Sequence, residues 1–307
     1  MVWPEKDGRR MITFIVNPKA GGGTCLDKMT KVEKLLRTQG VEYEFVYTEY
    51  PKHACELAAK AALSGSETVV ACGGDGTLNE TLNGLVAAKK ALADKEGGSE
   101  VKLGVMPCGT GNDFMRSAAM DTDLFVSLKR VLQGNSKRVD YIDISGIAMI
   151  CFSNAGIDCE VVELCNKEKR KTKLSYVKNL IKCVFSTKYY DYTVEINGEK
   201  KQFCGVIVSV LNGSSIASGL NYCPGAEVDD KLLDVVIVKK KNRLVMACDL
   251  IALAAGRLQK RATAEYLKAS SVKITSDCPV VDVDGELYYG LDYDARIADE
   301  GIRLVCD

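Results

Sequence analysis

Three glycine-rich segments of the sequence have the composition of phosphate-binding loops. They run from Asn17 to Gly23, from Gly73 to Thr77 and from Pro107 to Phe114. Glycine lets backbone N–H groups approach a phosphate closely, and the start of a following helix adds a partial positive charge. None of the segments completes a P-loop, and neither of the last two completes Gly-x-Gly-x-x-Gly. The sequence therefore indicates a polyphosphate site of another kind.

A carboxylate stands among the glycines of the second segment. Asp75 would repel a phosphate unless a cation lay between them, so its natural partner is Mg²⁺ bound to a nucleotide. One glycine cluster alone would be interpreted as a tight strand-to-helix turn, and Thr77 and Asn112 as helix caps. The only histidine, His53, follows Tyr50 to Lys52 at a predicted helix start, where packing or capping is the better interpretation.

The elements that position these loops alternate between strand and helix. Apolar periodicity predicts strands over 11–16, 41–47, 67–72 and 101–106 and helices over 26–36, 53–63 and 77–93. This order predicts a parallel sheet with helices on both faces and ligands at the carboxyl ends of the strands.

The pattern becomes rich in strands beyond residue 134. Strands are predicted over 138–145, 149–154, 190–196, 203–211 and 233–238, and helices over 158–167, 173–185 and 243–258. Asn197-Gly198 is a strong hairpin signal. The expected fold is an α/β plus β protein, with an N-terminal doubly wound α/β nucleotide-binding domain and a C-terminal antiparallel β-sandwich-like domain. We assign residues 9–134 and 294–307 to the first and 135–293 to the second.

Composition limits the partners of the chain. Its 41 Lys and Arg equal its 41 Asp and Glu, so no global field favours nucleic acid, which is not an expected partner. Thirteen cysteines form no Cys-x-x-Cys pair, and no secretory leader precedes the first strand, which favours reduced thiols in a cytoplasm. The apolar stretches 203–211 and 244–255 are too short, or carry Asp249, to span a membrane.

Several segments together resemble the diacylglycerol kinase catalytic family. They are Gly73 to Thr77 with Leu78-Asn79-Glu80, the early Asn17-Pro18, and Gly109 to Phe114. Further matches follow in the family's order at Asn154-Ala155-Gly156, Asp229 to Asp234 and Asp284-Gly285-Glu286. This order is more specific than Gly-Gly-Asp-Gly alone, which NAD kinases and phosphofructokinases also have.

The resemblance implies roles for individual residues. The positions that correspond to ATP contacts are Asn17, Pro18, Lys19, Ala20, Gly21, Thr48, Gly74, Asp75, Gly76, Thr77, Leu78, Asn79, Glu80 and Thr110. Asp75 and Asp140 match acidic positions that hold the catalytic Mg²⁺. Glu286 matches the proposed proton acceptor, with Asp284 two residues before it. On an extended strand these two residues share a face, so both are kept as candidates for the base.

A second, structural Mg²⁺ is implied at a turn of the second domain. Its ligands would be the Glu227 backbone, Asp230 and the Leu232 backbone. The sequence departs from the family here, because Lys231 replaces the usual glycine. The departure leaves open whether the acids hold a metal or only form a turn.

The predicted function is that of an ATP- and Mg²⁺-dependent lipid kinase, with diacylglycerol as the first choice of acceptor. Sphingoid bases, ceramide and other lipid alcohols remain alternatives, as do an NAD kinase and a nucleotide-binding regulator without activity. The basic runs of residues 167–173 and 239–243 are interpreted either as solvated faces or as transient, peripheral contacts with anionic lipid. The oligomeric state stays open between a monomer and a homodimer.

Overall fold

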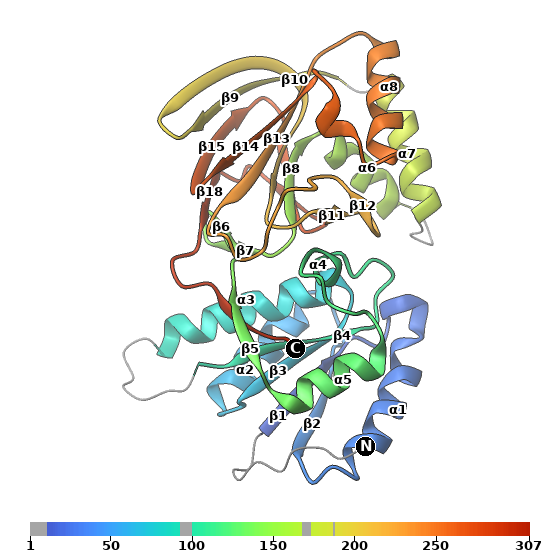
Figure 1. Cartoon of the computed structure of the whole chain (residues 1–307), viewed down its shortest axis with the longest axis vertical. Coiled ribbons are helices and arrows are strands. Elements are labelled where there is room, and N and C mark those ends of the chain that lie inside the picture. The colour runs from blue at the N-terminus through green and yellow to red at the C-terminus, as the bar shows by residue number, and fades with distance from the viewer. Residues whose placement is uncertain (1–10, 93–99, 168–172, 187) are drawn as a thin grey trace. The chain divides into compact units, whose positions relative to one another are not determined.

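The structure, a computed structural model, describes residues 11–92, 100–167, 173–186 and 188–307 (Figure 1). The chain divides into two compact units. The first comprises Met1–Val139 and Glu300–Asp307, and the second Asp140–Asp299. Each unit has its own sheet and its own apolar core.

A six-stranded sheet in the order β2-β1-β3-β4-β19-β5 forms the centre of the first unit. Strands β1 (Met11–Val16), β2 (Glu42–Tyr47), β3 (Thr68–Gly73), β4 (Lys102–Pro107) and β19 (Ile302–Val305) are parallel, and β5 (Ser136–Val139) is antiparallel to β19. Every residue of β3 is buried, as expected for a strand covered by helices on both faces. The carboxyl ends of β1, β3 and β4 therefore lie side by side.

Helices cover both faces of this sheet. Helices α1 (Cys25–Leu36) and α5 (Leu124–Gln133) pack their apolar residues into one core, with Phe14 and Val70 of the sheet. Helices α2 (His53–Leu63) and α3 (Asp75–Leu92) pack against each other and against β1 and β3. They are close because Gly84 has no side chain: a Cβ there would lie 2.2 Å from the Cys55 carbonyl oxygen. A short helix, α4, spans Asp113–Ser117.

The second unit is built on an eleven-stranded, antiparallel sheet. Its members are β6 (Ile142–Ile144), β7 (Ile147–Met149), β8 (Phe152–Gly156), β9 (Tyr190–Ile196), β10 (Glu199–Leu211), β13 (Leu233–Lys239), β14 (Ala264–Ala269), β15 (Ser271–Ser276), β16 (Val280–Val283), β17 (Glu286–Tyr289) and β18 (Tyr293–Ile297). The long strand β10 pairs with β8, β9 and β13, so the sheet branches there. Asn197 and Gly198 both have positive φ in the β9–β10 hairpin, as their sequence predicts.

Three helices and a small ribbon complete the second unit. Helices α6 (Ile157–Asn166), α7 (Lys173–Ser186) and α8 (Arg243–Ala254) lie together beside the sheet (Figure 1). The two-stranded ribbon consists of β11 (Ser215–Ile216) and β12 (Leu220–Asn221). The predicted fold class, α/β followed by antiparallel β, is confirmed.

The unit boundaries differ from those expected from sequence. Residues 136–139 form β5 and pair with β19, so they complete the sheet of the first unit. Residues 293–297 form β18, which pairs with β15 and β6 and buries Tyr293 and Ala295 in the second core. Of the C-terminal residues assigned to the first unit from sequence, only those from Glu300 onward belong to it. The single strand predicted over 138–145 is in fact two strands, one in each unit.

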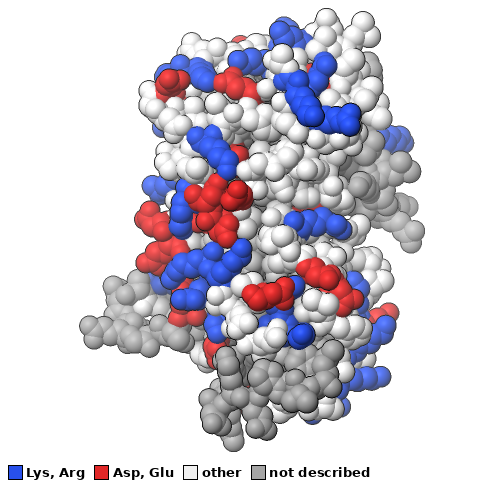
Figure 2. All heavy atoms as spheres, viewed as in Figure 1, with Lys and Arg blue, Asp and Glu red and all other residues white. Residues whose placement is uncertain are grey.

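Surface composition agrees with the charge balance of the sequence. Basic and acidic side chains are both present on the face shown in Figure 2, and the formal net charge of the chain is zero. No helix among the described residues is long and apolar enough to cross a membrane.

Candidate active site

The first glycine-rich loop begins where β1 ends. The Asn17 N–H donates to the Cys72 carbonyl at 3.0 Å, and the Asn17 side-chain amide donates to Thr77 Oγ1 at 3.0 Å. The Asn17 Oδ1 in turn accepts from the Lys19 N–H at 3.0 Å. Asn17 therefore fastens its own loop to the start of α3. The Thr48 N–H donates to the Val16 carbonyl at 2.9 Å, which places the end of β2 beside the same loop.

The second and third loops touch through their glycines. A Cβ on Gly109 would lie 2.3 Å from the Gly74 Cα, so only glycine allows this approach. Gly21 of the first loop has φ +59°, and a Cβ there would lie 2.4 Å from the Cys108 carbonyl oxygen. The structure thus brings the three predicted loops together at one edge of the sheet. Their backbone N–H groups and the N-terminus of α3 form a concentration of donors suited to an anion.

Asp75 stands at the first position of α3, within this group of loops. Its Oδ1 accepts from the Phe114 N–H at 3.1 Å, which ties the second loop to α4. Burial raises the pKa of Asp75 above its usual range, and the neighbouring Asp113 carboxylate raises it further. A cation beside Asp75 would offset both effects, so the carboxylate suits a divalent ion shared with phosphate oxygens.

Several residues predicted to contact the nucleotide also have structural tasks. Leu78 is 2% exposed, and Thr77 is buried beneath the Asn17 amide, which leaves mainly their backbones for a ligand. The Glu80 carboxylate accepts from the Lys52 N–H at 3.0 Å and the Ala54 N–H at 3.1 Å, so it caps α2. Thr110 is exposed on the third loop. His53 stacks on Tyr50 and accepts from the Glu49 N–H, which fits the predicted packing role.

Asp284 of the second unit has a geometry that the sequence did not predict. Asp284 and Gly285 form the β16–β17 turn, with φ values of +50° and +88°, so residues 284 and 286 are not alternate members of one extended strand. The Asp284 carboxylate accepts three backbone N–H bonds of 2.8–2.9 Å, from residues 150, 151 and 152. The expectation that Asp284 and Glu286 share a face is therefore wrong at this turn.

Glu286 follows the turn as the first residue of β17 and is half-buried. Its Oε2 accepts from the Tyr288 hydroxyl at 3.3 Å. Burial and the Glu286 carboxylate raise the pKa of Tyr288 to about 12, so Tyr288 stays a hydrogen-bond donor. Glu286 is thus the more accessible of the two carboxylates predicted as the base.

The acids implied as metal ligands in the second unit contact lysines. Asp140 is buried, and its Oδ1 lies 2.8 Å from the Lys231 Nζ. Asp230 forms an ion pair with Lys268, and its other oxygen accepts from the Leu232 N–H at 3.0 Å. Within the described parts of the chain, no three Asp, Glu, His or Cys side chains gather as a metal site. Asp230 of the predicted structural metal site is thus paired with Lys268, and Asp140, predicted to hold the catalytic Mg²⁺, is paired with Lys231.

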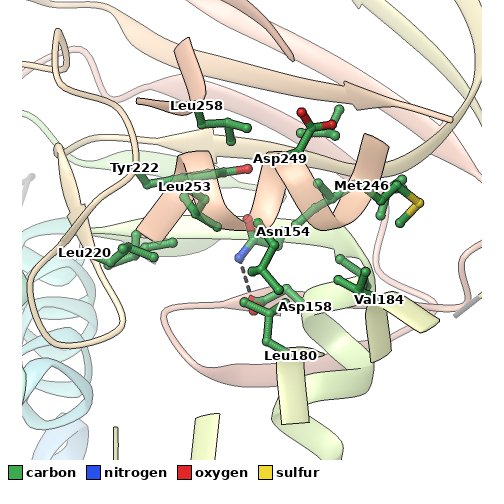
Figure 3. Close-up of a pocket in the computed structure, with 16 residues that line it drawn as sticks. Asn154, Asp158, Leu180, Val184, Leu220, Tyr222, Met246, Asp249, Leu253 and Leu258 are labelled. Atoms are coloured by element: carbon green, nitrogen blue, oxygen red, sulfur yellow. Dashed lines mark hydrogen bonds between the residues drawn. The ribbon is translucent and has the colours of Figure 1, made fainter. Parts of the chain in front are cut away.

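An apolar pocket lies in the second unit. Figure 3 shows Met246 and Leu253 of α8, Leu180 and Val184 of α7, and Leu220 around it. Ile157, Val206, Ile207, Ile216, Val238, Leu250 and Leu258 complete its apolar lining. The pocket is open to solvent, and its cavity volume is about 90 Å³. Its lining is that of a site for an apolar ligand.

Polar groups line part of this pocket. The Asn154 amide donates to Asp158 Oδ2 at 2.7 Å, a bond drawn in Figure 3. Burial and the nearby Asp158 carboxylate raise the pKa of Asp282, which is fully buried, well above its usual range. Asp249 of α8 also lines the pocket and pairs with Arg261 at 2.7 Å. The pocket therefore offers an amide and carboxylates beside its apolar walls.

The sequence held two signals of this pocket. Asn154 lies in β8 and Asp158 follows four residues later in the first turn of α6, and a hydrogen bond joins their side chains. Asp249 interrupts an otherwise apolar helix and is buried. Neither signal identifies which helices meet, because that depends on packing between α6, α7 and α8.

Comparisons with known proteins agree with this geometry. Residues 11–144 match the diacylglycerol kinase catalytic domain, and residues 152–306 match the YegS C-terminal NAD kinase beta sandwich-like domain. The chain is 27% identical over 288 residues to a diacylglycerol kinase of Staphylococcus saprophyticus, covering 91% of this chain and 89% of the other. It is 28% identical over 287 residues to one of Staphylococcus carnosus, with the same coverage of 91% and 89%.

A solved structure shares the fold. The structure of a diacylglycerol kinase from Bacillus anthracis str. Sterne matches with a TM-score of 0.77 at 21% identity, covering 99% of each chain. The two domain matches together extend from residue 11 to residue 306. The chain therefore belongs to the diacylglycerol kinase catalytic family of lipid kinases, with a C-terminal domain of the YegS type.

Proposed function

We propose that the protein transfers the terminal phosphoryl group of ATP to the hydroxyl of a lipid alcohol, with diacylglycerol as the first candidate and phosphatidic acid as its product. The observation that carries the choice of acceptor is the apolar pocket of the second unit, whose wall includes Asn154 and Asp158. An acyl chain would fill the apolar part, and hydroxyl groups would donate to the carboxylate. A soluble dinucleotide such as NAD has no acyl chain to fill this apolar lining.

The nucleotide would bind the three glycine-rich loops of the first unit. Backbone N–H groups beside Gly21, Gly74 and Gly109 would hold the phosphates, while the N-terminus of α3 adds its partial positive charge. Asp75 would hold Mg²⁺ together with phosphate oxygens, and the ion would neutralise the charge that develops on them. Asp75 fits this task because its buried carboxylate lacks a basic neighbour among the groups that shift its pKa.

The proton of the lipid hydroxyl needs an acceptor, and we assign Glu286 to it. As the hydroxyl oxygen bonds to the terminal phosphorus, its proton passes to the Glu286 carboxylate, and the bond from phosphorus to the bridging oxygen of ADP breaks. Asp284 instead holds the backbone of residues 150–152 and fixes the turn that precedes Glu286. Asp284 is thus a positioning residue in this proposal.

A sphingoid base is the second candidate acceptor. Asp158 and Asp249 line the pocket, and a carboxylate at an apolar site favours a cationic amine as well as a hydroxyl. The same reaction at the primary hydroxyl would then give a sphingoid base phosphate. Diacylglycerol and the sphingoid base differ in this amine, so one assay distinguishes them.

The deciding experiment is a transfer assay with radiolabelled ATP. Diacylglycerol, a sphingoid base, ceramide and NAD are each presented to the purified protein, the lipids in mixed micelles. Label is expected in a lipid phosphate when Mg²⁺ is present and to disappear with excess EDTA. Label in NAD alone, or undiminished lipid phosphorylation in EDTA, would contradict the proposal.

A pocket variant controls for the assignment of the acceptor site. Leu253→Trp places a large ring in the apolar part of the pocket. The KM for a long-chain lipid should rise by about 10-fold, whereas the KM for ATP stays unchanged, because the loss of an apolar contact is worth about 1–3 kcal/mol. An unchanged lipid KM would mean that the acceptor binds elsewhere.

Membrane contact is part of the same proposal, since the acceptor lies in a bilayer. Helix α8 turns Met246 and Leu253 into the pocket but leaves Leu244 79% exposed and Ile251 70% exposed. The basic run of residues 239–243 precedes this helix. Of the first basic run, Lys169, Arg170 and Lys171 lie outside the described residues. The exposed apolar side chains beside basic ones suit the surface of an anionic bilayer.

Vesicle sedimentation tests this surface. The wild type is expected to bind vesicles that contain anionic lipid more tightly than neutral ones, and less tightly as salt rises. Replacing both Leu244 and Ile251 with serine should weaken binding by about 10-fold or more, because each buried apolar side chain contributes about 1.5–3 kcal/mol. Equal binding of neutral and anionic vesicles would assign the basic run to a solvated face. Equal binding of the variant and the wild type would show that Leu244 and Ile251 do not enter the bilayer.

A further inference from the structure

Lys231 holds the turn from Glu227 to Leu232 against Asp140. The Lys231 ammonium lies 2.8 Å from Asp140 Oδ1, and the Lys231 backbone N–H donates to Asp140 Oδ2 at 2.7 Å. Asp140 is 1% exposed, whereas the Lys231 side chain is 52% exposed. Both oxygens of a buried carboxylate are thus bound by one residue, which enters from the surface.

A second lysine pairs with Asp230 of the turn. Lys268 forms an ion pair with Asp230, and the hydrogen bond that its ammonium donates to Asp230 raises the pKa of Lys268, which keeps it charged. The other oxygen of Asp230 accepts from the Leu232 N–H at 3.0 Å. The Lys268 Nζ also lies 3.9 Å from Asp234 Oδ2. Asp140 and Asp230 therefore each have an ammonium group in contact.

These contacts conflict with the requirements of a divalent ion. Mg²⁺ demands about six oxygen ligands at about 2.0–2.1 Å, and its carboxylate ligands must be free to face it. Here the carboxylate oxygens of Asp140 and Asp230 already accept from N–H groups, and two ammonium groups stand beside them. A divalent ion at this place would meet their positive charge at short range.

The backbone of Lys231 indicates that its side chain is important. Lys231 has φ +62°, a conformation that glycine adopts freely and that costs stability for lysine. In this conformation its N–H donates to Asp140 Oδ2. A lysine in this unfavourable conformation is consistent with a side chain whose ion pair stabilises the fold by more than the backbone conformation costs.

We propose that the ammonium groups of Lys231 and Lys268 take the place of a structural divalent cation, so that the fold of the second unit depends on these lysines and not on Mg²⁺. The lysines supply the positive charge that the acids of the turn need, and they do so as part of the chain. Combined with the proposed kinase function, on which this consequence rests, the metal requirement reduces to the ion bound with the nucleotide.

Thermal unfolding without nucleotide tests the proposal independently of any catalysis. The wild type should have the same Tm in excess EDTA and in millimolar Mg²⁺, within about 1 °C. Lys231→Met should lower the Tm by roughly 5–10 °C in EDTA, because it leaves the buried Asp140 carboxylate without its ammonium partner. A wild-type Tm that falls by several degrees in EDTA, or a Lys231→Met variant as stable as the wild type, would overturn the proposal.

Three further variants separate the side chain from the backbone and from net charge. Lys231→Gly relieves the positive φ, so a lower Tm in this variant supports the ion pair, and a Tm at or above the wild-type value contradicts it. Lys200→Met removes an exposed lysine of β10 and should leave the Tm unchanged. In the Asp140→Asn background, Lys231→Met should cost much less than in the wild type. Equal costs in both backgrounds would show that the two residues do not act as a pair.

Discussion

Replacing Glu286 with glutamine is expected to lower kcat by about 10²- to 10⁴-fold and to leave ATP binding and folding nearly intact. Glutamine keeps the shape of the side chain and accepts the Tyr288 hydroxyl hydrogen bond, but it cannot take a proton. Glu286 is half-buried at the start of β17 in the second unit, whereas the glycine-rich loops belong to the first. Steady-state kinetics with ATP and lipid varied separately, together with the Tm of the variant, measure the effect.

The Asp284→Asn variant is the matched comparison. Asp284 accepts three backbone N–H bonds, and an amide group can replace only part of them. Its main effect should be a loss of about 2–4 kcal/mol in the free energy of unfolding, because the three N–H donors of residues 150–152 lose a charged acceptor. If Glu286→Gln keeps a near wild-type kcat while folded Asp284→Asn is inactive, the base has been assigned to the wrong carboxylate. If both stay active, Asp75 becomes the leading candidate.

The sequence was sufficient to predict the fold class because its pattern changes beyond residue 134, from alternating strands and helices to mostly strands. Buried strands such as β3 alternate with helices in the first unit, and the predicted bounds of α2, 53–63, match the structure. The second unit has short strands and the Asn197-Gly198 turn, which fixes the β9–β10 register. Sequence could not determine that β18 stays in the second unit, because a strand of only five residues suits either sheet. Its partners, β15 and β6, are distant in sequence.

The candidate site was predictable where its geometry depends on the small size of glycine. Glycine at positions 21, 74 and 109 is required by the close approach of the three loops, and the parallel sheet brings their ends together. The second unit was less predictable because side chains there are fixed by tertiary contacts. The Asp284-Gly285 turn breaks the strand alternation that the prediction assumed. The pocket depends on how α6, α7 and α8 pack, and no local pattern encodes that arrangement.

Asp75→Asn is expected to lower the activity but not the stability of the protein. The variant should lose about 10³-fold or more in kcat/KM, because the ion that neutralises the transferring phosphoryl group loses a charged ligand worth several kcal/mol. The KM for ATP should rise as well, which distinguishes this variant from Glu286→Gln. Glu44→Gln removes one exposed charge from β2 of the same unit and should leave kcat/KM unchanged.

The stability of the Asp75→Asn variant, without nucleotide, should equal or exceed that of the wild type. Folding raises the pKa of Asp75 above its ordinary value of 3.8, chiefly by burial, so the charged side chain costs stability at neutral pH. That cost disappears as the pH falls through the raised folded-state pKa toward 3.8, and the asparagine amide can still accept from the Phe114 N–H. The difference in Tm between variant and wild type should therefore shrink from pH 7 to pH 4. A variant that is clearly less stable at pH 7 would show that the Asp75 carboxylate supports the fold, and its loss of activity could then not be assigned to the metal.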